Sequence, residues 1–226
     1  MRQGPVSVFE CLFSLSPGCG SRPILTPMPA LSESAIAELI HPYLPDAPVI
    51  LLPKLSAYLD LLLKWNARTN LTAIRRPEEI VRRHFGESLF AALHLDPETP
   101  TLLDFGSGAG FPGIPIALLR PGIQVTLAES QNKKAAFLRE AVRTLNLSSE
   151  VWAARVELMP AERRFHAITL RAVDRMEVAL PIAEARLAAG GQLVLLMTTT
   201  QMPAGGRSIP LPNSTTGMVY LKSGAP

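Results

Sequence analysis

The chain has 226 residues, of which 47% are hydrophobic and 18% are charged, and it carries a formal net charge of +3 with a pI of about 9.1. This composition excludes an intrinsically disordered chain, and no apolar run approaches the roughly 20 residues that a membrane-spanning helix needs. The charge is compatible with a nucleic-acid partner but does not require one.

The first 30 residues differ from the rest of the chain. Gly, Pro and Ser dominate them, and Glu10 interrupts the apolar stretch that a secretory signal would need. We therefore predict that residues 1–30 are a disordered or misassigned leader, with the functional start near Met28. The only two cysteines, Cys11 and Cys19, also lie here. They complete neither a zinc site nor a disulfide framework, so we expect a cytoplasmic protein without a bound metal.

Three amphipathic segments follow, over residues 31–96. The first begins at a Ser32 or Ser34 cap, and its apolar residues then recur at helical spacing. The second, over residues 53–70, carries a similar apolar stripe. The third starts at Pro77, a residue favoured in the first helical turn, and two glutamates that complement the helix dipole come next. Residues 31–96 are predicted to form a helical N-terminal extension.

Short apolar strands then alternate with helices over residues 97–226, which we predict to form one domain. This alternation indicates an α/β fold with a mostly parallel sheet of the Rossmann-like type. The segment 209–222 reads as two short strands around a turn, which would add an antiparallel edge and bring the sheet to seven strands. The expected strands cover 101–108, 124–130, 150–156, 166–173 and 191–197, and the expected helices cover 113–119, 133–147 and about 175–189.

A glycine-rich loop follows the first predicted strand in the run LLDFGSGAGFPGIPI, residues 102–116. Residues 108–113 satisfy the dinucleotide fingerprint GxGxxG, and Glu129 lies about 20 residues further on, where a ribose-binding acid belongs. However, Asp104 stands between the apolar strand and the first glycine, and Pro112 interrupts the triplet. An acid that closes each of the first two strands, with DxGxGxG between them, resembles the S-adenosylmethionine (AdoMet) methyltransferase arrangement. A nicotinamide site and a plain glycine turn remain the alternatives.

Several segments together resemble the family of the glucose-inhibited division protein B, bacterial guanine-N7 methyltransferases that act on 16S ribosomal RNA. The resemblance covers roughly residues 55–200. It is carried by the segments WNARTNLTAIRRPEEIVRRHFGESL, LLDFGSGAGFPGIPIALLRP, QVTLAESQNKKAAFLREAV, AARVE and LRAV. The leader has no counterpart in that pattern. Beyond Met197, an atypical segment replaces a longer and more charged connection to the last strand.

The resemblance implies a class I AdoMet-dependent methyltransferase whose cofactor contacts can be carried over residue by residue. Glu129 takes the ribose position. Arg171 is also predicted to be catalytic, because it follows an apolar strand at the edge of the sheet, where an uncompensated charge would be costly. Asp104 is expected to orient the loop or the amino group of the cofactor. The full predicted cofactor set is Asp104, Gly106, Gly108, Phe111, Glu129, Val156, Glu157 and Arg171.

A basic cluster in the third helical segment is the predicted RNA-binding surface, comprising Arg75, Arg76, Arg82, Arg83 and His84. A solvated basic face is the alternative for each arginine, and a packed histidine is the alternative for His84. The resemblance implies a monomer that transfers a methyl group to N7 of a guanine in the 530 loop of 16S rRNA, within the small ribosomal subunit. The rival functions are methylation of a protein or small molecule and a nicotinamide or noncatalytic nucleotide-binding module.

Overall fold

The computed structural model describes residues 30–173, 175–199 and 203–224. The predicted leader, except for Ala30, lies outside these residues. Among the helices of these three ranges, none is long and apolar enough to cross a membrane.

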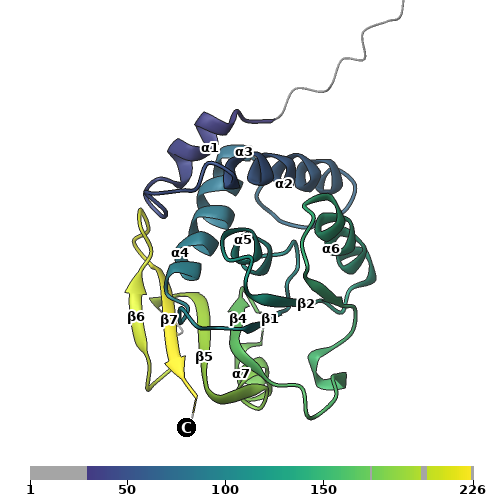
Figure 1. Cartoon of the computed structure of the whole chain (residues 1–226), viewed down its shortest axis with the longest axis vertical. Coiled ribbons are helices and arrows are strands. Elements are labelled where there is room, and N and C mark those ends of the chain that lie inside the picture. The colour runs from purple at the N-terminus through teal and green to yellow at the C-terminus, as the bar shows by residue number, and fades with distance from the viewer. Residues whose placement is uncertain (1–29, 174, 200–202, 225–226) are drawn as a thin grey trace, which may run out of the picture.

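The segment after the leader is helical, as predicted (Figure 1). Ser32 caps the first helix, since its Oγ accepts a hydrogen bond from the Ala35 N–H at 3.2 Å. The third segment begins at Pro77, continues as a π-helix of seven residues and ends as an α-helix. The elements are α1 (Glu33–Ile40), α2 (Leu51–Asn66), α3 (Pro77–Glu79), the π-helix η1 (Ile80–Gly86) and α4 (Glu87–Leu93).

A seven-stranded sheet with strand order β3-β2-β1-β4-β5-β7-β6 follows. The first five strands are parallel, and β7 runs antiparallel to both β5 and β6. The predicted mostly parallel sheet with an antiparallel edge is therefore confirmed. Its strands are β1 (Thr101–Phe105), β2 (Gln124–Ala128), β3 (Glu150–Trp152), β4 (Phe165–Arg171), β5 (Leu187–Thr198), β6 (Arg207–Pro210) and β7 (Gly217–Ser223).

The connecting elements are α5 (Gly113–Leu119), α6 (Asn132–Thr144), the short 3-10 helix η2 (Val156–Leu158) and α7 (Met176–Glu184). Two sequence predictions were wrong here. The strand expected over 150–156 ends at Trp152, because its only neighbour β2 ends at the paired residue Ala128. The helix expected to reach about 189 ends at Glu184, because β5 begins at Leu187, which pairs with Phe165.

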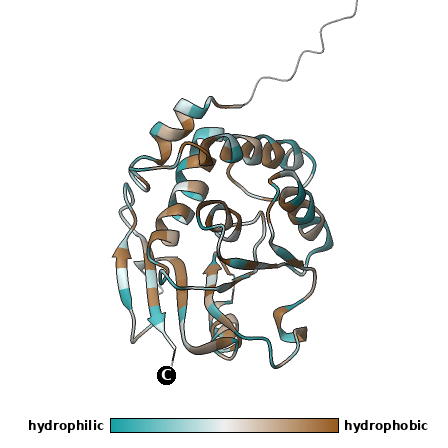
Figure 2. Ribbon diagram, viewed as in Figure 1, coloured by the Kyte–Doolittle hydropathy of each residue, from teal (hydrophilic) through white to brown (hydrophobic). Residues whose placement is uncertain are grey.

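The two faces of the sheet are covered by different helices. Leu102 and Val125 point into the larger core, which contains side chains of α1, α2, α4, α5 and α6. Leu103 and Ile168 point the other way, into a smaller core that includes Ala179 and Ala183 of α7. The alternation along each strand places apolar side chains on both faces, and the central strands are correspondingly brown in Figure 2.

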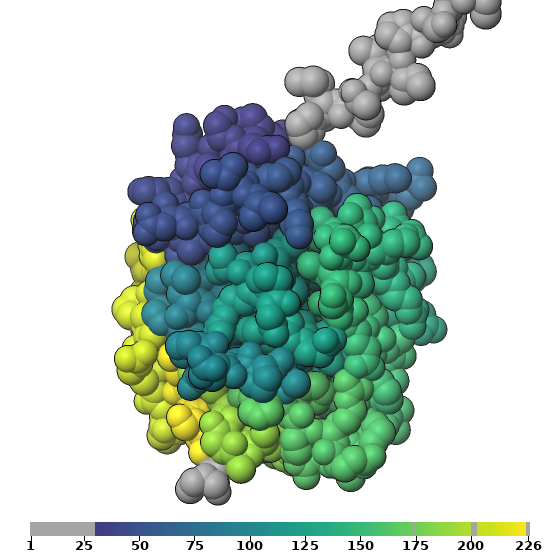
Figure 3. Space-filling view, in the orientation of Figure 1, coloured from purple at the N-terminus to yellow at the C-terminus, as the bar shows by residue number. Residues whose placement is uncertain are grey.

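The helical extension shares the larger core with the sheet. Buried Leu55, Phe85 and Leu89 of the extension belong to the same cluster as Leu102 and Val194 of the strands. Figure 3 shows the blue surface of the extension directly against the teal surface of the α5 region and bordering the yellow β6–β7 segment. The extension is thus packed as part of one hydrophobic core.

Candidate active site

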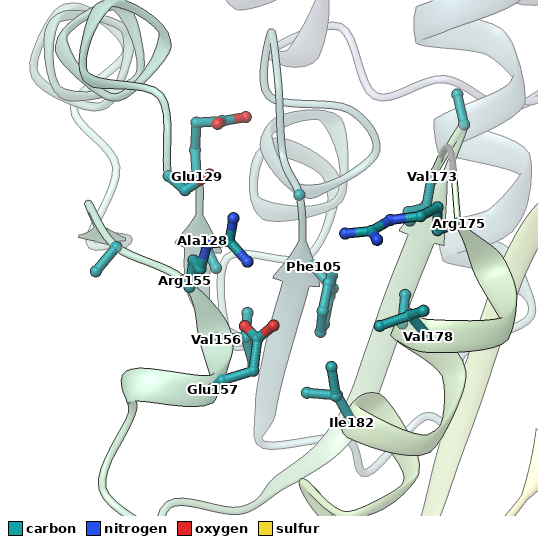
Figure 4. Close-up of a pocket in the computed structure, with 15 residues that line it drawn as sticks. Phe105, Ala128, Glu129, Arg155, Val156, Glu157, Val173, Arg175, Val178 and Ile182 are labelled. Carbon is teal, nitrogen blue, oxygen red and sulfur yellow. The ribbon is translucent and has the colours of Figure 1, made fainter.

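A cavity of about 330 Å³ lies over the carboxyl ends of the central strands (Figure 4). Ligands of open α/β sheets bind at this edge, at the point where the strand order reverses, which here is between β1 and β4. Its volume is within the range of small-molecule sites. The lining residues are Phe105, Gly106, Ala128, Glu129, Ser130, Ala154, Arg155, Val156, Glu157, Ala172, Val173, Arg175, Val178, Ala179 and Ile182.

The glycine loop borders this cavity because its backbone adopts a conformation that other residues avoid. Gly106 has φ +73°, and a Cβ added to it would meet no atom within 4 Å. The residue is therefore glycine because of its dihedral angle, and the space beside it is open to a ligand. Gly113 differs, because a Cβ there would lie 2.7 Å from Asp104 Oδ2. That glycine allows α5 to approach the end of β1 closely.

Asp104 is fully buried below the loop and is held by two hydrogen bonds. Its Oδ2 accepts from the Gly113 N–H at 3.1 Å, and its Oδ1 accepts from the Thr169 hydroxyl at 2.8 Å. Burial raises the pKa of this carboxyl to about 6, and the hydrogen bonds oppose that rise. The geometry fits the expectation that Asp104 orients the loop, since it ties the start of α5 to β4.

Glu129 follows β2 and extends to the glycine loop. Its Oε2 accepts from the Gly108 N–H at 3.0 Å and its Oε1 accepts from the Gln131 N–H at 2.7 Å. A carboxylate has about four lone-pair positions, so each oxygen can accept one more hydrogen bond. In Figure 4 the Glu129 carboxylate and the Arg175 guanidinium point inward from opposite sides of the cavity. Glu129 is therefore suited to hold a pair of hydroxyl groups.

On the same side of the cavity as Glu129, η2 carries two of the predicted residues (Figure 4). Val156 is buried at 3% exposure and presents an apolar surface, whereas Glu157 is exposed at the mouth. The sequence analysis missed two basic lining residues, Arg155 and Arg175. Arg155 directly precedes the predicted Val156–Glu157 pair, and Arg175 precedes α7 at its amino end, so position alone could have indicated both.

Four predicted cofactor residues, Asp104, Gly108, Phe111 and Arg171, do not line this cavity. Phe111 is buried beneath the loop and stacks on His84, with ring centroids 4.6 Å apart. Arg171 points to the far side of β4, where its Nη2 donates to Glu87 Oε2 at 2.6 Å and to the Arg83 carbonyl at 2.9 Å. The cavity thus brings together Gly106, Glu129, Val156 and Glu157, with Asp104 and Gly108 supporting them.

The predicted basic cluster divides into bound and free arginines. Arg75 donates to the Asn66 carbonyl and to Asn70 Oδ1, so it closes the loop after α2. Arg83 lies 3.8 Å from Glu79 and 4.0 Å from Glu87. Arg76 has one exposed contact, to Glu78 at 3.9 Å. Arg82 is exposed, and it forms neither a hydrogen bond nor an ion pair with a residue that the structure describes.

His84 belongs to η1 of the extension, and its ring is largely enclosed against Phe111 of the glycine loop. Its Nε2 forms a hydrogen bond with the Thr72 hydroxyl at 2.8 Å. Burial and the nearby Arg171 and Arg83 lower its pKa to about 3, so the imidazole is neutral at physiological pH. A neutral ring contributes no charge to phosphate binding. Among the described residues there is also no group of three or more His, Cys, Asp or Glu side chains that could hold a metal ion.

The family model and the relatives that match this chain carry the same description. A family model described as GidB, rRNA small subunit methyltransferase G, matches residues 51–203. Ribosomal RNA small subunit methyltransferase G from Stenotrophomonas maltophilia is 39% identical over 186 residues, covering 79% of this chain and 86% of that protein. The protein of the same name from Nitrosomonas europaea is 46% identical over 125 residues, covering 55% and 58%.

Two solved structures share the fold. A putative O-methyltransferase from Klebsiella pneumoniae superposes with a TM-score of 0.57 at 15% identity, covering 85% of this chain and 97% of that chain. A Thermus thermophilus 16S rRNA N2 methyltransferase in complex with AdoMet and guanosine gives a TM-score of 0.50 at 19% identity, covering 61% and 42%.

Proposed function

The chain belongs to the rRNA small subunit methyltransferase G family, and on that premise we propose that it methylates N7 of a guanine in the 530 loop of 16S rRNA. It is an AdoMet-dependent methyltransferase that modifies ribosomal RNA. The position of the methyl group on the base and the location of that base in the RNA are the parts that we propose. We expect the protein to act as a monomer in the cytoplasm.

The residues of the first cavity fit AdoMet, which supplies an electrophilic methyl group when bound. Glu129 can accept hydrogen bonds from two ribose hydroxyls with the lone pairs that Gly108 and Gln131 leave free. Val156 presents an apolar surface suited to the adenine face, with Glu157 beside it. The open backbone at Gly106 allows the methionine part to approach the loop. These groups bind and orient the cofactor.

The single observation that carries the N7 assignment is that no histidine or cysteine is among the described residues that line the first cavity. Guanine N7 has a free lone pair at neutral pH and loses no proton when it is methylated, so positioning suffices. His84 stacks on Phe111 of the glycine loop, with ring centroids 4.6 Å apart, and its pKa of about 3 and its contact with Thr72 make it a packing residue. The RNA must present the base in an unstacked conformation for N7 to approach.

Labelled AdoMet incubated with small ribosomal subunits, or with bare 16S RNA, tests this proposal directly. Digestion of the RNA to nucleosides should place the label in 7-methylguanosine, and mapping should place that nucleoside in the 530 loop. Label in another nucleoside would contradict the N7 assignment, and label confined to protein would contradict the RNA substrate.

A further inference from the structure

A second cavity, of about 350 Å³, lies on the other side of the end of β4. Ala172 and Val173 line both cavities, so the two sites are separated only by the short segment that follows β4. The remaining walls come from the helical extension, the end of β5, the start of α7 and the β6–β7 turn. A group bound here would therefore lie next to the cofactor site.

A buried ion pair forms one end of this second cavity. The side chains of Arg171 and Glu87 are only 12% and 13% exposed, and their closest N···O distance is 2.6 Å. Such a pair is costly to bury and is weak evidence for stability by itself. Its position beside an open cavity suggests a role in binding.

Each member of the pair retains unused hydrogen-bonding capacity. Arg171 Nη1 is buried and has no hydrogen-bond partner among the described residues. Glu87 Oε1 lies 4.0 Å from Arg83 Nε, which is too long for a hydrogen bond. An unsatisfied buried guanidinium donor is unfavourable, and a ligand that supplies the acceptor removes that cost. Both residues line the cavity, so its polar end includes one unused donor and one unused acceptor.

The other walls suit a flat, largely apolar group. Val173, Met176, Leu196 and Met197 line the cavity, and methionine side chains adapt well to aromatic rings. Tyr43 closes the side next to the extension. Its ring lies so close to η1 that a Cβ added at Gly86 would be 2.4 Å from it, which explains a glycine inside a helical run.

We propose that this second cavity binds the target guanine base once it has left the RNA stack, with Arg171 Nη1 donating to O6 and Glu87 Oε1 accepting from N1–H and the 2-amino group. The inference rests on the proposed function and assigns the base specificity of that same site. Reading an extruded base by its Watson–Crick edge is a general solution for enzymes that modify bases. Arg171 and Glu87 are then specificity-determining residues for the RNA substrate.

The arrangement selects guanine over adenine. Adenine offers an amino donor where guanine has O6, and a bare N1 lone pair where guanine has N1–H, so both contacts with the pair would become repulsive. The N7 lone pair lies on the edge that Arg171 and Glu87 leave free, so reading the base does not block the reacting atom. The ring also gains positive charge as N7 reacts, and the carboxylate of Glu87 stabilises that charge.

The test compares two RNA substrates with the same enzyme preparation. One RNA carries guanosine at the target position and the other carries inosine, which lacks only the 2-amino group. Wild-type protein should methylate the guanosine RNA at least about tenfold faster in single turnover, because a hydrogen bond to a carboxylate is lost with inosine. In Glu87→Gln the amide oxygen would face Arg171 and the amide N–H groups would face the base. The guanosine-to-inosine ratio should then fall to about 1.

The ratio is independent of the amount of folded enzyme, so a merely structural role of Glu87 would not change it. Glu184→Gln is the matched control, because Glu184 forms a comparable ion pair with Lys222 at 2.7 Å on the surface, and its ratio should equal that of wild type. If Glu87→Gln transfers no methyl group, the ratio of binding affinities for the two RNAs, measured with the demethylated cofactor present, replaces the ratio of rates.

Equal rates of wild type on both RNAs, or an unchanged ratio in Glu87→Gln, would overturn the assignment of the base cavity while leaving the proposed function intact. A wild-type protein that binds AdoMet but transfers no methyl group to the guanosine RNA would overturn the proposed function, and this inference with it.

Discussion

Replacement of the buried Asp104 by Asn should stabilise the protein at neutral pH. The ionised carboxylate is fully buried, and its pKa of about 6 shows that burial outweighs its hydrogen bonds. Asn can keep both contacts, because its Oδ1 accepts from the Gly113 N–H while its amino group donates to the Thr169 hydroxyl. That hydroxyl can then turn toward the Leu103 carbonyl, 3.5 Å away. The substitution removes the charge and keeps the contacts with Gly113 and Thr169.

The size and sign of the effect follow from the pKa. In the folded state the carboxyl binds its proton more tightly than at its ordinary value of 3.8, so the contribution of Asp104 is most favourable below about pH 4 and is lost as pH rises to about 6. A rise from 3.8 to about 6 corresponds to about 3 kcal/mol at pH 8. About 2 kcal/mol of this develops between pH 4.5 and pH 8.

Urea unfolding followed by circular dichroism, at several pH values from about 4.5 to 8, measures the effect. The free energy of unfolding of Asp104→Asn, minus that of wild type, should grow with pH and then level off. Asp46→Asn, in an exposed loop after α1, is the control for the same chemical change. A difference that stays constant with pH, or an Asn variant less stable than wild type at pH 8, would refute the reasoning.

Three further outcomes are expected. Glu129→Ala should weaken AdoMet binding by about 1–3 kcal/mol in calorimetry, because charge-assisted hydrogen bonds are lost; Glu184→Ala should bind normally, and tight NAD binding in place of AdoMet would contradict the cofactor class. Replacing Arg76 and Arg82 together by Ala should weaken RNA binding and reduce its salt dependence by about one ion per phosphate contact, with AdoMet affinity unchanged; an unchanged slope would mean a solvated surface. His84→Gln should retain the single-turnover rate within about tenfold, and wild type should show a nearly flat rate from about pH 6.5 to 8.5; a rise with a midpoint near pH 6.5 that disappears in the variant would indicate a general base.

The sheet and the glycine loop could be predicted from the sequence because their signals are local. Alternating apolar strands and helices determine a parallel sheet, and a loop such as that at Gly106 needs backbone angles that glycine adopts without strain. Strand and helix ends were less predictable. The apolar run after Trp152 is compatible with a strand, but β2 ends and leaves it without a partner.

Side-chain direction at the strand ends was beyond local reasoning. Phe111 and Gly106 belong to the same loop, yet Phe111 turns under it and packs on Tyr58, with ring centroids 5.5 Å apart, while Gly106 faces the cavity. The difference depends on the extension, whose aromatic side chains create an apolar site for Phe111. Likewise, the glycine at Gly86 has no local explanation and is accounted for by the ring of Tyr43.

The environment of Arg171 could be predicted only in part from its charge and its position in the sequence. Its position after an apolar strand correctly indicated that the guanidinium would need compensation, but sequence could not identify Glu87, 84 residues earlier, as the partner. That partner lies on the extension, and so do Tyr43 and Arg83 of the same cavity. The strand ends supply the cofactor cavity, and the extension supplies the polar end of the adjoining one. The helical extension is therefore part of the active site in our proposal, because without it Arg171 would lose its carboxylate and the base its acceptor.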